Sequence, residues 1–187
     1  MSSKFKILGK KIIHNGFFKM KEITLKYQKY DGKWSNEIKR ELFGGAQVSA
    51  VLPYDPDNKK IVLIQQFRPG TISKKSDNYL DEIVAGIIDK GETPEETAIR
   101  ECFEETGCKA KNLRAIQGYF PAPGSSESFY HLFLGEVIAP NKEIIKGLEN
   151  ENEDILVKSY SFEEVKKKME NNEILNGLTL IALQWFF

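Results

Sequence analysis

The segment from Pro94 to Thr106 concentrates carboxylates in a pattern suited to metal chemistry. On a helical wheel, Glu101, Glu104 and Glu105 fall together on one flank. Glu101 and Glu105 are one turn apart, where like charges destabilise an isolated helix by about 0.2–0.5 kcal/mol. Mg²⁺ prefers oxygen ligands and keeps several of its waters. The spacing therefore indicates a divalent-metal site open to a phosphate-bearing substrate, although a surface helix with solvated glutamates would have the same composition.

Signals at both ends predict where this helix begins and ends. Thr93 and Glu96 have the spacing of a capping box, Pro94 suits the first helical position, and Gly107 is typical of a left-handed cap. The face expected to pack on a sheet comprises Ala98, Ile99, Cys102, Phe103 and Thr106. The two cysteines are expected to behave as small buried hydrophobic residues.

The chain before this helix favours β-structure, with strands expected at 23–30, 34–43, 46–52 and 61–67. Asp31-Gly32 is a two-residue hairpin signal, and the turn at 54–58 joins the next pair of strands. A loop at 68–78 and a strand-and-loop segment at 79–88 lead into the helix.

The chain after the helix mixes both kinds of element. The expected elements are strands at 113–119 and 128–137, a proline-rich loop at 120–127, an acidic loop at 141–154, a helix from Ser161 to about Asn171, and a terminal helix at 178–187. Ser161 and Glu164 repeat the capping-box spacing. The whole pattern predicts an α+β domain with helices packed on antiparallel or mixed sheets.

Composition narrows the class of protein. The chain has 187 residues and no net charge, which suits one globular domain with a small subdomain. Only two histidines are present, so a histidine-based zinc site is not expected. Lys and Arg form no dense cluster interleaved with aromatics, which argues against nucleic acid as a partner. No leader sequence or membrane-length apolar run is seen, and a cytoplasmic location is expected.

The complete spacing is more specific than the glutamates alone. Gly86, five residues, Glu92, seven residues, Arg100-Glu101, two residues, Glu104-Glu105, one residue and Gly107 resemble the Nudix box at every fixed position. The box expects aliphatic residues at 102 and 108, where this chain has cysteine. The resemblance implies a Nudix α/β/α sandwich and hydrolysis of nucleoside diphosphates linked to another moiety.

By the same resemblance, residues of the box acquire expected roles. Glu101 and Glu105 would be metal ligands, assisted by Glu104 and by the carbonyl of Ala85. Arg100 could orient Glu104 through an ion pair. The expected metal is Mg²⁺, with Mn²⁺ as an alternative.

Segments outside the box resemble the ADP-ribose pyrophosphatase branch of the family. These are Gly16-Phe17-Phe18, Lys39-Arg40-Glu41, the segments 52–56 and 64–68, the loop from Phe120 to Glu127 containing Pro123, the acidic segment 147–154 and the ending 181–185. The branch implies a homodimer in which an N-terminal antiparallel β-sheet subdomain, residues 1–45, is exchanged between subunits. Residues 46–187 would form the Nudix domain.

Roles in substrate binding and catalysis follow from this resemblance. Phe17 would stack on adenine, Arg40 of one subunit would pair with the base or diphosphate bound by the other, Arg68 would hold a phosphate, and Glu127 would face the substrate. Glu151 is the expected general base and Glu153 a further metal ligand. Because Glu149, Glu151 and Glu153 alternate, the assignment of the base among them stays open.

The expected reaction is metal-dependent hydrolysis of ADP-ribose to AMP and ribose 5-phosphate. The main alternative is another nucleotide sugar such as GDP-mannose. A nucleoside-triphosphate hydrolase and an RNA pyrophosphohydrolase are weaker alternatives, the latter because no basic RNA track is present. A non-catalytic Nudix-fold binding module would be expected to lose carboxylates of the box, and here all are present.

Overall fold

The computed structural model describes residues 4–74, 78–148 and 152–187, and they form two compact units. Residues up to Ala46, together with Phe120–Phe129, form unit 1. Gln47–Tyr119 and Tyr130–Phe187 form unit 2. The proline-rich loop therefore belongs by its contacts to the N-terminal unit, although it is inserted between two strands of the other.

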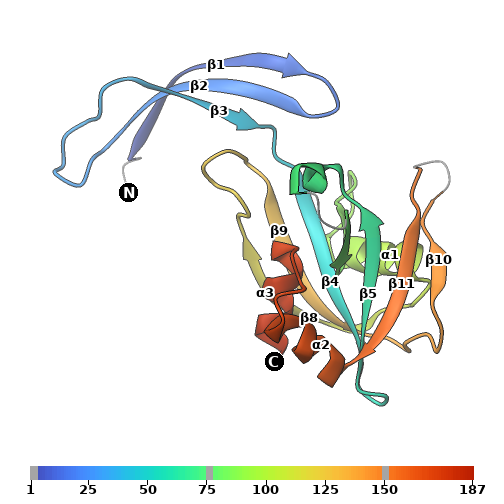
Figure 1. Cartoon of the computed structure of the whole chain (residues 1–187). Helices are drawn as coiled ribbons and strands as arrows, with labels where there is room; N and C mark the ends of the chain where they lie inside the picture. Colours follow the sequence, from blue (N-terminus) through green and yellow to red (C-terminus); the bar gives the residue numbers. More distant parts are fainter. Residues whose placement is uncertain (1–3, 75–77, 149–151) are drawn as a thin grey trace. The chain divides into compact units, whose positions relative to one another are not determined.

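Unit 1 contains a three-stranded antiparallel sheet in the order β1-β2-β3 (Figure 1). Its strands are β1 (Phe5–Asn15), β2 (Lys19–Tyr27) and β3 (Ile38–Phe43). Gly32 has the positive φ of the expected turn, but the return strand does not begin at Trp34 as predicted. Trp34 forms only an isolated bridge, because the Ser35 hydroxyl accepts the Tyr27 N–H at 3.0 Å in place of a regular ladder bond.

The proline-rich loop is joined to the end of β3 by backbone contacts. The Phe43 N–H donates to the Ser125 carbonyl at 2.8 Å. A Cβ at Gly45 would lie 2.3 Å from the carbonyl carbon of Glu127, so only glycine permits this close approach. The backbone thus fixes the position of the loop within unit 1.

Unit 2 is built on an eight-stranded sheet. Its strands are β4 (Gln47–Asp55), β5 (Lys60–Phe67), β6 (Tyr79–Glu82), β7 (Val84–Ile87), β8 (Lys111–Tyr119), β9 (Phe129–Glu136), β10 (Ile144–Lys146) and β11 (Ile155–Ser161). The main order is β10-β11-β5-β4-β9-β8, while β6 pairs with β5 and β7 pairs with β4.

Helices cover both faces of this sheet, as Figure 1 shows. They are α1 (Pro94–Thr106), α2 (Phe162–Glu170) and α3 (Gly177–Phe186), with a 3₁₀ helix, η1 (Pro69–Lys74), after β5. The core on one face contains Ala98 and Cys102 of α1, and the core on the other contains Val165 of α2 and Leu183 of α3. The α/β/α sandwich is confirmed. Among the described residues, no helix combines the length and hydrophobicity needed to cross a bilayer.

The helix-boundary predictions are confirmed at α1 and α2. The Glu96 N–H donates to the Thr93 hydroxyl at 3.2 Å, and the Thr93 N–H donates to the Glu96 carboxylate at 2.8 Å. Ser161 and Glu164 make the same reciprocal pair at α2. Gly107 ends α1 with φ of 72°. Local side-chain chemistry alone therefore fixes where both helices begin.

The predicted buried face of α1 is partly wrong. Ile99 is 37% exposed and Phe103 is 59% exposed, whereas Thr97 and Glu105 are buried. Burial of these polar residues is tolerated because both make hydrogen bonds. The Thr97 hydroxyl donates to the Glu92 carboxylate at 2.7 Å, and the Glu105 carboxylate accepts a hydrogen bond from the Ala85 N–H of β7.

Four elements were not predicted from the sequence. Strand β1 lies before the first expected strand, β10 lies in the expected acidic loop, η1 lies in the expected loop at 68–78, and β11 lies between that acidic loop and the helix at Ser161. Ile155 and Val157 of β11 are fully buried, and the strand pairs with β5. Short apolar runs of this kind carry no decisive period, so tertiary pairing determines the outcome.

Asp55, at the end of β4, offers a test of how the sandwich is stabilised. Although burial opposes ionisation, hydrogen bonds from the Ala139 N–H and from the Asn58 side chain and N–H lower the pKa of its carboxyl. Asp55→Asn should lower the free energy of unfolding at pH 7 by about 1–3 kcal/mol, because an amide NH₂ must face a donor. Urea denaturation measures this loss.

The contribution of Asp55 to the free energy of unfolding should decrease as the pH falls. A depressed carboxyl pKa contributes stability above the unfolded value of about 3.9, and this contribution is lost as pH falls. The difference between wild type and Asp55→Asn should therefore shrink below about pH 4. Exposed Asp57→Asn is the matched control. An equal loss in both variants, or a gap that is constant with pH, would contradict this role.

Candidate metal centre

Helix α1 presents its glutamates to strand β7 at three different depths. Glu105 is 4% exposed, and the side chains of Glu101 and Glu104 are 16% and 30% exposed. The Ala85 N–H on β7 donates to the Glu105 carboxylate. A Cβ at Gly86 would lie 1.8 Å from Glu101 Oε1. Glycine at 86 is thus required for this carboxylate to lie against the strand.

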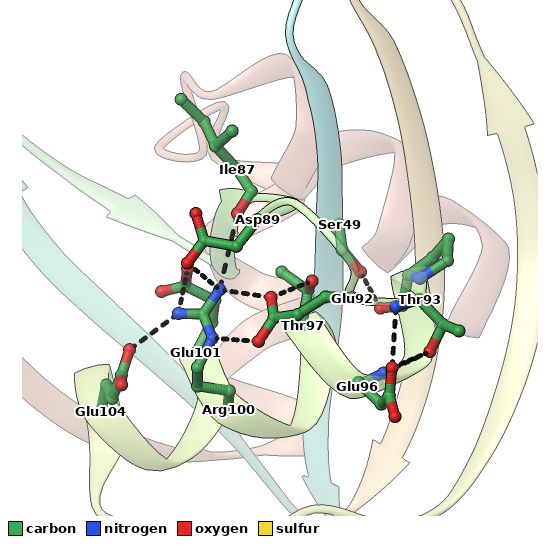
Figure 2. A network of polar contacts seen from close by, with 11 residues as sticks. Ser49, Ile87, Asp89, Glu92, Thr93, Glu96, Thr97, Arg100, Glu101 and Glu104 are labelled. Atoms are coloured by element: carbon green, nitrogen blue, oxygen red, sulfur yellow. Dashed lines mark hydrogen bonds and ion pairs between the residues drawn. The ribbon is translucent and has the colours of Figure 1, made fainter.

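Arg100 holds the outer carboxylates together, as Figure 2 shows. Its Nε donates to Glu92 Oε1 at 2.8 Å and its Nη2 donates to Glu92 Oε2 at 2.9 Å. Its Nη1 donates to Glu101 Oε1 at 2.8 Å and to Glu104 Oε2 at 2.9 Å. One guanidinium therefore serves three carboxylates of the box, and the expected contact of Arg100 with Glu104 is one part of this network.

The network changes the ionisation of its members. Hydrogen bonds from Arg100, with a further one from the Thr97 hydroxyl, lower the pKa of Glu92 to about 2. The carboxylates in turn raise the pKa of Arg100 above its ordinary value, with Glu92 contributing most. Glu92 is therefore an anion that anchors Arg100 from one side. The other two carboxylates bound by Arg100 are those of Glu101 and Glu104, which line a cavity.

The inner carboxylates have the opposite shift. Burial raises the pKa of Glu105 well above its usual range, and repulsion from Glu101 and Glu153 adds to this. Burial also raises the pKa of Glu101 against the opposing hydrogen bond from Arg100. Within the described residues, Glu105 Oε2 is buried and has no hydrogen-bond partner. A buried carboxylate oxygen without a donor is costly, and a cation at this point would satisfy it.

A cavity of about 260 Å³ adjoins these carboxylates. Its lining comprises Ala85, Gly86, Ile87, Asp89, Arg100, Glu101, Glu104, Glu105, Leu148 and Glu153. Glu153 reaches it from the segment between β10 and β11, where its Oε2 accepts the Leu148 N–H at 3.3 Å. Residues far apart in sequence thus supply oxygen atoms to one space.

The residues around this cavity fit a hard divalent cation. Carboxylate and carbonyl oxygens are the ligands that Mg²⁺ prefers, and within the described residues Oε2 of Glu105 lacks a hydrogen-bond donor. Among residues 4–74, 78–148 and 152–187, no three acidic, His or Cys side chains are already gathered closely enough to enclose an ion. Mutual repulsion and the hold of Arg100 on Glu101 account for this spread, because a cation would be needed to draw the carboxylates together.

Arg68, the expected phosphate ligand, also lies in unit 2. Its guanidinium forms an ion pair with Glu82 of β6, with Nη2 to Oε2 at 2.8 Å. This hydrogen bond raises the pKa of Arg68, and the charges of Glu105 and Glu153 act in the same direction. Glu82 is not among the site residues predicted from the sequence. A charged residue in the apolar segment before Gly86 was the available signal.

The other expected substrate residues lie in unit 1. Phe17 is 92% exposed and meets Phe18 edge-on at 4.9 Å. Arg40 is exposed on β3, and the Glu127 carboxylate forms an ion pair with Lys21. All three side chains therefore belong to the unit that lacks the box, and within the described part of the chain only Glu127 among them is held in an ion pair. Glu151, the expected base, lies outside the described residues, as does Glu149.

Both cysteines of the box region are buried and free. Burial raises the pKa of the Cys102 thiol to about 12, and it also raises the pKa of Cys108. Cys102 packs in the core beneath α1, which agrees with its expected role as a small hydrophobe.

Comparison with known proteins agrees with this fold. The NUDIX domain model matches residues 45–178, which include the whole of α1 and β7. The chain belongs to this family.

Individual proteins of known function resemble this chain over nearly its whole length. The chain is 37% identical to an ADP-ribose pyrophosphatase of Haemophilus influenzae over 182 residues, covering 96% of this chain and 84% of the relative. It is 28% identical to a GDP-mannose pyrophosphatase of Shigella flexneri, covering 99% and 96%. A solved structure described as an ADP compounds hydrolase has the same fold, with a TM-score of 0.74, 21% identity and coverage of 98% and 92%.

Substitution of Gly86 tests the contact between α1 and β7. Gly86→Ala should displace the Glu101 carboxylate and weaken Mg²⁺ binding roughly tenfold or more, measured by calorimetry. Gly177→Ala is the control, since a Cβ there meets nothing within 4 Å. Unchanged Mg²⁺ affinity in Gly86→Ala, with the fold intact by circular dichroism, would remove Glu101 from the metal centre.

Proposed function

We propose that this chain hydrolyses the diphosphate of ADP-ribose to AMP and ribose 5-phosphate, with Mg²⁺ or Mn²⁺ as its metal. The observation that carries the proposal is the buried, unpartnered oxygen of Glu105 beside a cavity lined by further carboxylates. The likeness to an ADP-ribose pyrophosphatase over nearly the whole chain supports the choice of substrate.

The metal would be held by Glu101, Glu105 and Glu153 with the carbonyl of Ala85. When bound, it supplies positive charge that stabilises the negative charge developing on the diphosphate. Arg100 keeps Glu104 and Glu101 oriented toward the cavity through the hydrogen bonds from its Nη1.

The remaining roles fall to side chains outside the box. The carboxylate of Glu151 accepts a proton from the attacking water, a role open to a group that is not occupied by metal. Arg68 binds a phosphate oxygen through the part of its guanidinium that Glu82 leaves free. Phe17 stacks on adenine, while Arg40 and Glu127 contact the nucleotide.

A homodimer is part of this proposal. All of β1 is exposed, including Phe5, Ile7, Leu8, Ile12 and Ile13 at 40–58%. Exposed apolar strands invite a covering partner, and a second copy of the chain would serve. Ile12→Asp should convert a dimer to a monomer in light scattering, whereas Lys11→Asp should not. A monomeric wild-type chain would contradict the dimer.

Product analysis tests the substrate. ADP-ribose incubated with Mg²⁺ in H₂¹⁸O should yield AMP and ribose 5-phosphate, and the ¹⁸O label identifies which phosphorus is attacked. Removal of the metal by EDTA should stop turnover. GDP-mannose is the comparison substrate, because a pyrophosphatase acting on it is 28% identical to this chain. Faster release of GMP from GDP-mannose than of AMP from ADP-ribose would favour that second function.

Substitution of Glu105 tests the metal centre within this reaction. Glu105→Gln should lower kcat more than about 100-fold, beyond what outer partners of a metal usually contribute. The free energy of unfolding should stay equal or rise, because the substitution removes a buried unpaired charge. Exposed Glu95→Gln is the matched control. Retained turnover in Glu105→Gln would exclude this carboxylate as a ligand.

A glutamine scan of the alternating acidic residues assigns the base. Glu151→Gln should lose most of kcat while it keeps Mg²⁺ affinity. Glu153→Gln should weaken Mg²⁺ binding, and Glu149→Gln should resemble wild type. A loss of kcat at unchanged metal affinity in Glu149→Gln or Glu153→Gln, with Glu151→Gln active, would move the base to that residue.

A further inference from the structure

Glu82 is a buried carboxylate that the metal centre does not use. It is 5% exposed, and it accepts hydrogen bonds from Arg68 Nε at 3.1 and 3.2 Å and from Arg68 Nη2 at 2.8 Å. A carboxylate is seldom buried to this degree without a partner. The pair therefore fixes one edge of a guanidinium that is otherwise half-exposed.

The sheet register places this pair on the α1 face. Glu82 lies opposite Ile64 in the β5–β6 ladder, and Ile64 belongs to the core beneath α1. Arg68 follows the end of β5, four residues beyond Ile64. Its side chain therefore reaches back along the sheet to meet Glu82, toward the helix that carries the metal carboxylates.

The ion pair occupies only part of the Arg68 fork. Glu82 engages Nε and Nη2, and within the described residues Nη1 donates no hydrogen bond. The charges of Glu105 and Glu153 act on Arg68, so both carboxylates are within electrostatic reach. The long cationic side chain of Arg68 would pair with Glu105 or Glu153 unless another carboxylate held it in place.

We propose that Glu82 is a positioning residue, which holds Arg68 away from the metal carboxylates and leaves its free edge to bind a phosphate of the nucleoside diphosphate. This inference rests on the proposed function. Removal of Glu82 releases Arg68 to pair with Glu105 or Glu153, which weakens metal binding and misplaces the phosphate contact together.

The neighbouring Asp81 is a matched control on the same strand. It is 8% exposed and pairs with Lys168 at 3.0 Å and with Gln65 at 2.8 Å. Successive residues of a strand face opposite sides of the sheet, so Asp81 lies on the face away from the metal carboxylates. Its loss removes a buried ion pair of similar kind without affecting Arg68.

A double-mutant cycle tests the inference. Glu82→Ala should lower kcat/KM for ADP-ribose by up to about 10²-fold, as expected for a misplaced binding group. The double variant Glu82→Ala/Arg68→Ala should be no worse than Arg68→Ala alone, because Glu82 acts through Arg68. Asp81→Ala should instead add its effect to that of Arg68→Ala. Glu82→Gln, which keeps the side-chain shape, repeats the cycle if the alanine variant does not fold.

Binding of Mg²⁺ alone gives a readout that does not depend on the substrate. Calorimetry should show weaker Mg²⁺ affinity in Glu82→Ala and recovery of affinity in Glu82→Ala/Arg68→Ala. Additive losses in kcat/KM, or Mg²⁺ affinity that the second substitution does not restore, would overturn the role of Glu82. If ADP-ribose is not hydrolysed but Mg²⁺ affinity is lost and recovered in this way, the proposed substrate fails and the role of Glu82 stands.

Discussion

The buried carboxyl group of Glu105 constrains the structure around it. A carboxylate that is 4% exposed, with one oxygen lacking a partner, is unfavourable unless a cation compensates it. The backbone N–H of Ala85 stabilises the anion only in part. The fold therefore keeps a costly group at the contact between α1 and β7, where a metal would convert the cost into binding energy.

This constraint explains the residues that surround the carboxylate. Glycine at 86 lets Glu101 approach the strand, and Arg100 neutralises the outer carboxylates without reaching the innermost one. Glu92 holds Arg100 through two hydrogen bonds. Compensation of the carboxylates by hydrogen-bond donors thus decreases with depth, so that the least compensated oxygen is the most deeply buried.

The sequence predicted those parts of the fold that depend on neighbouring residues. The capping boxes of α1 and α2 and the cap at Gly107 are local, and their residues alone specify them. The burial of Glu105 and the strand β11 depend on partners elsewhere in the chain, and so does the Glu82–Arg68 ion pair. Helical periodicity treats a glutamate as exposed, because it contains no information about a backbone donor on another element.

The division of the chain into two units separates two kinds of chemistry. The side chains expected to hold metal lie in unit 2, whereas Phe17, Arg40 and Glu127 lie in unit 1. Glu127 belongs there because backbone bonds join its loop to β3 and because Lys21 pairs with its carboxylate. If the expected roles hold, substitutions in unit 1 would change the choice of nucleotide while the carboxylates of the box stay as they are. Arg68 is the exception, because this expected phosphate ligand lies in unit 2 and feels the charges of Glu105 and Glu153. A cation in that position would be drawn toward those carboxylates, and its ion pair with the buried Glu82 opposes this.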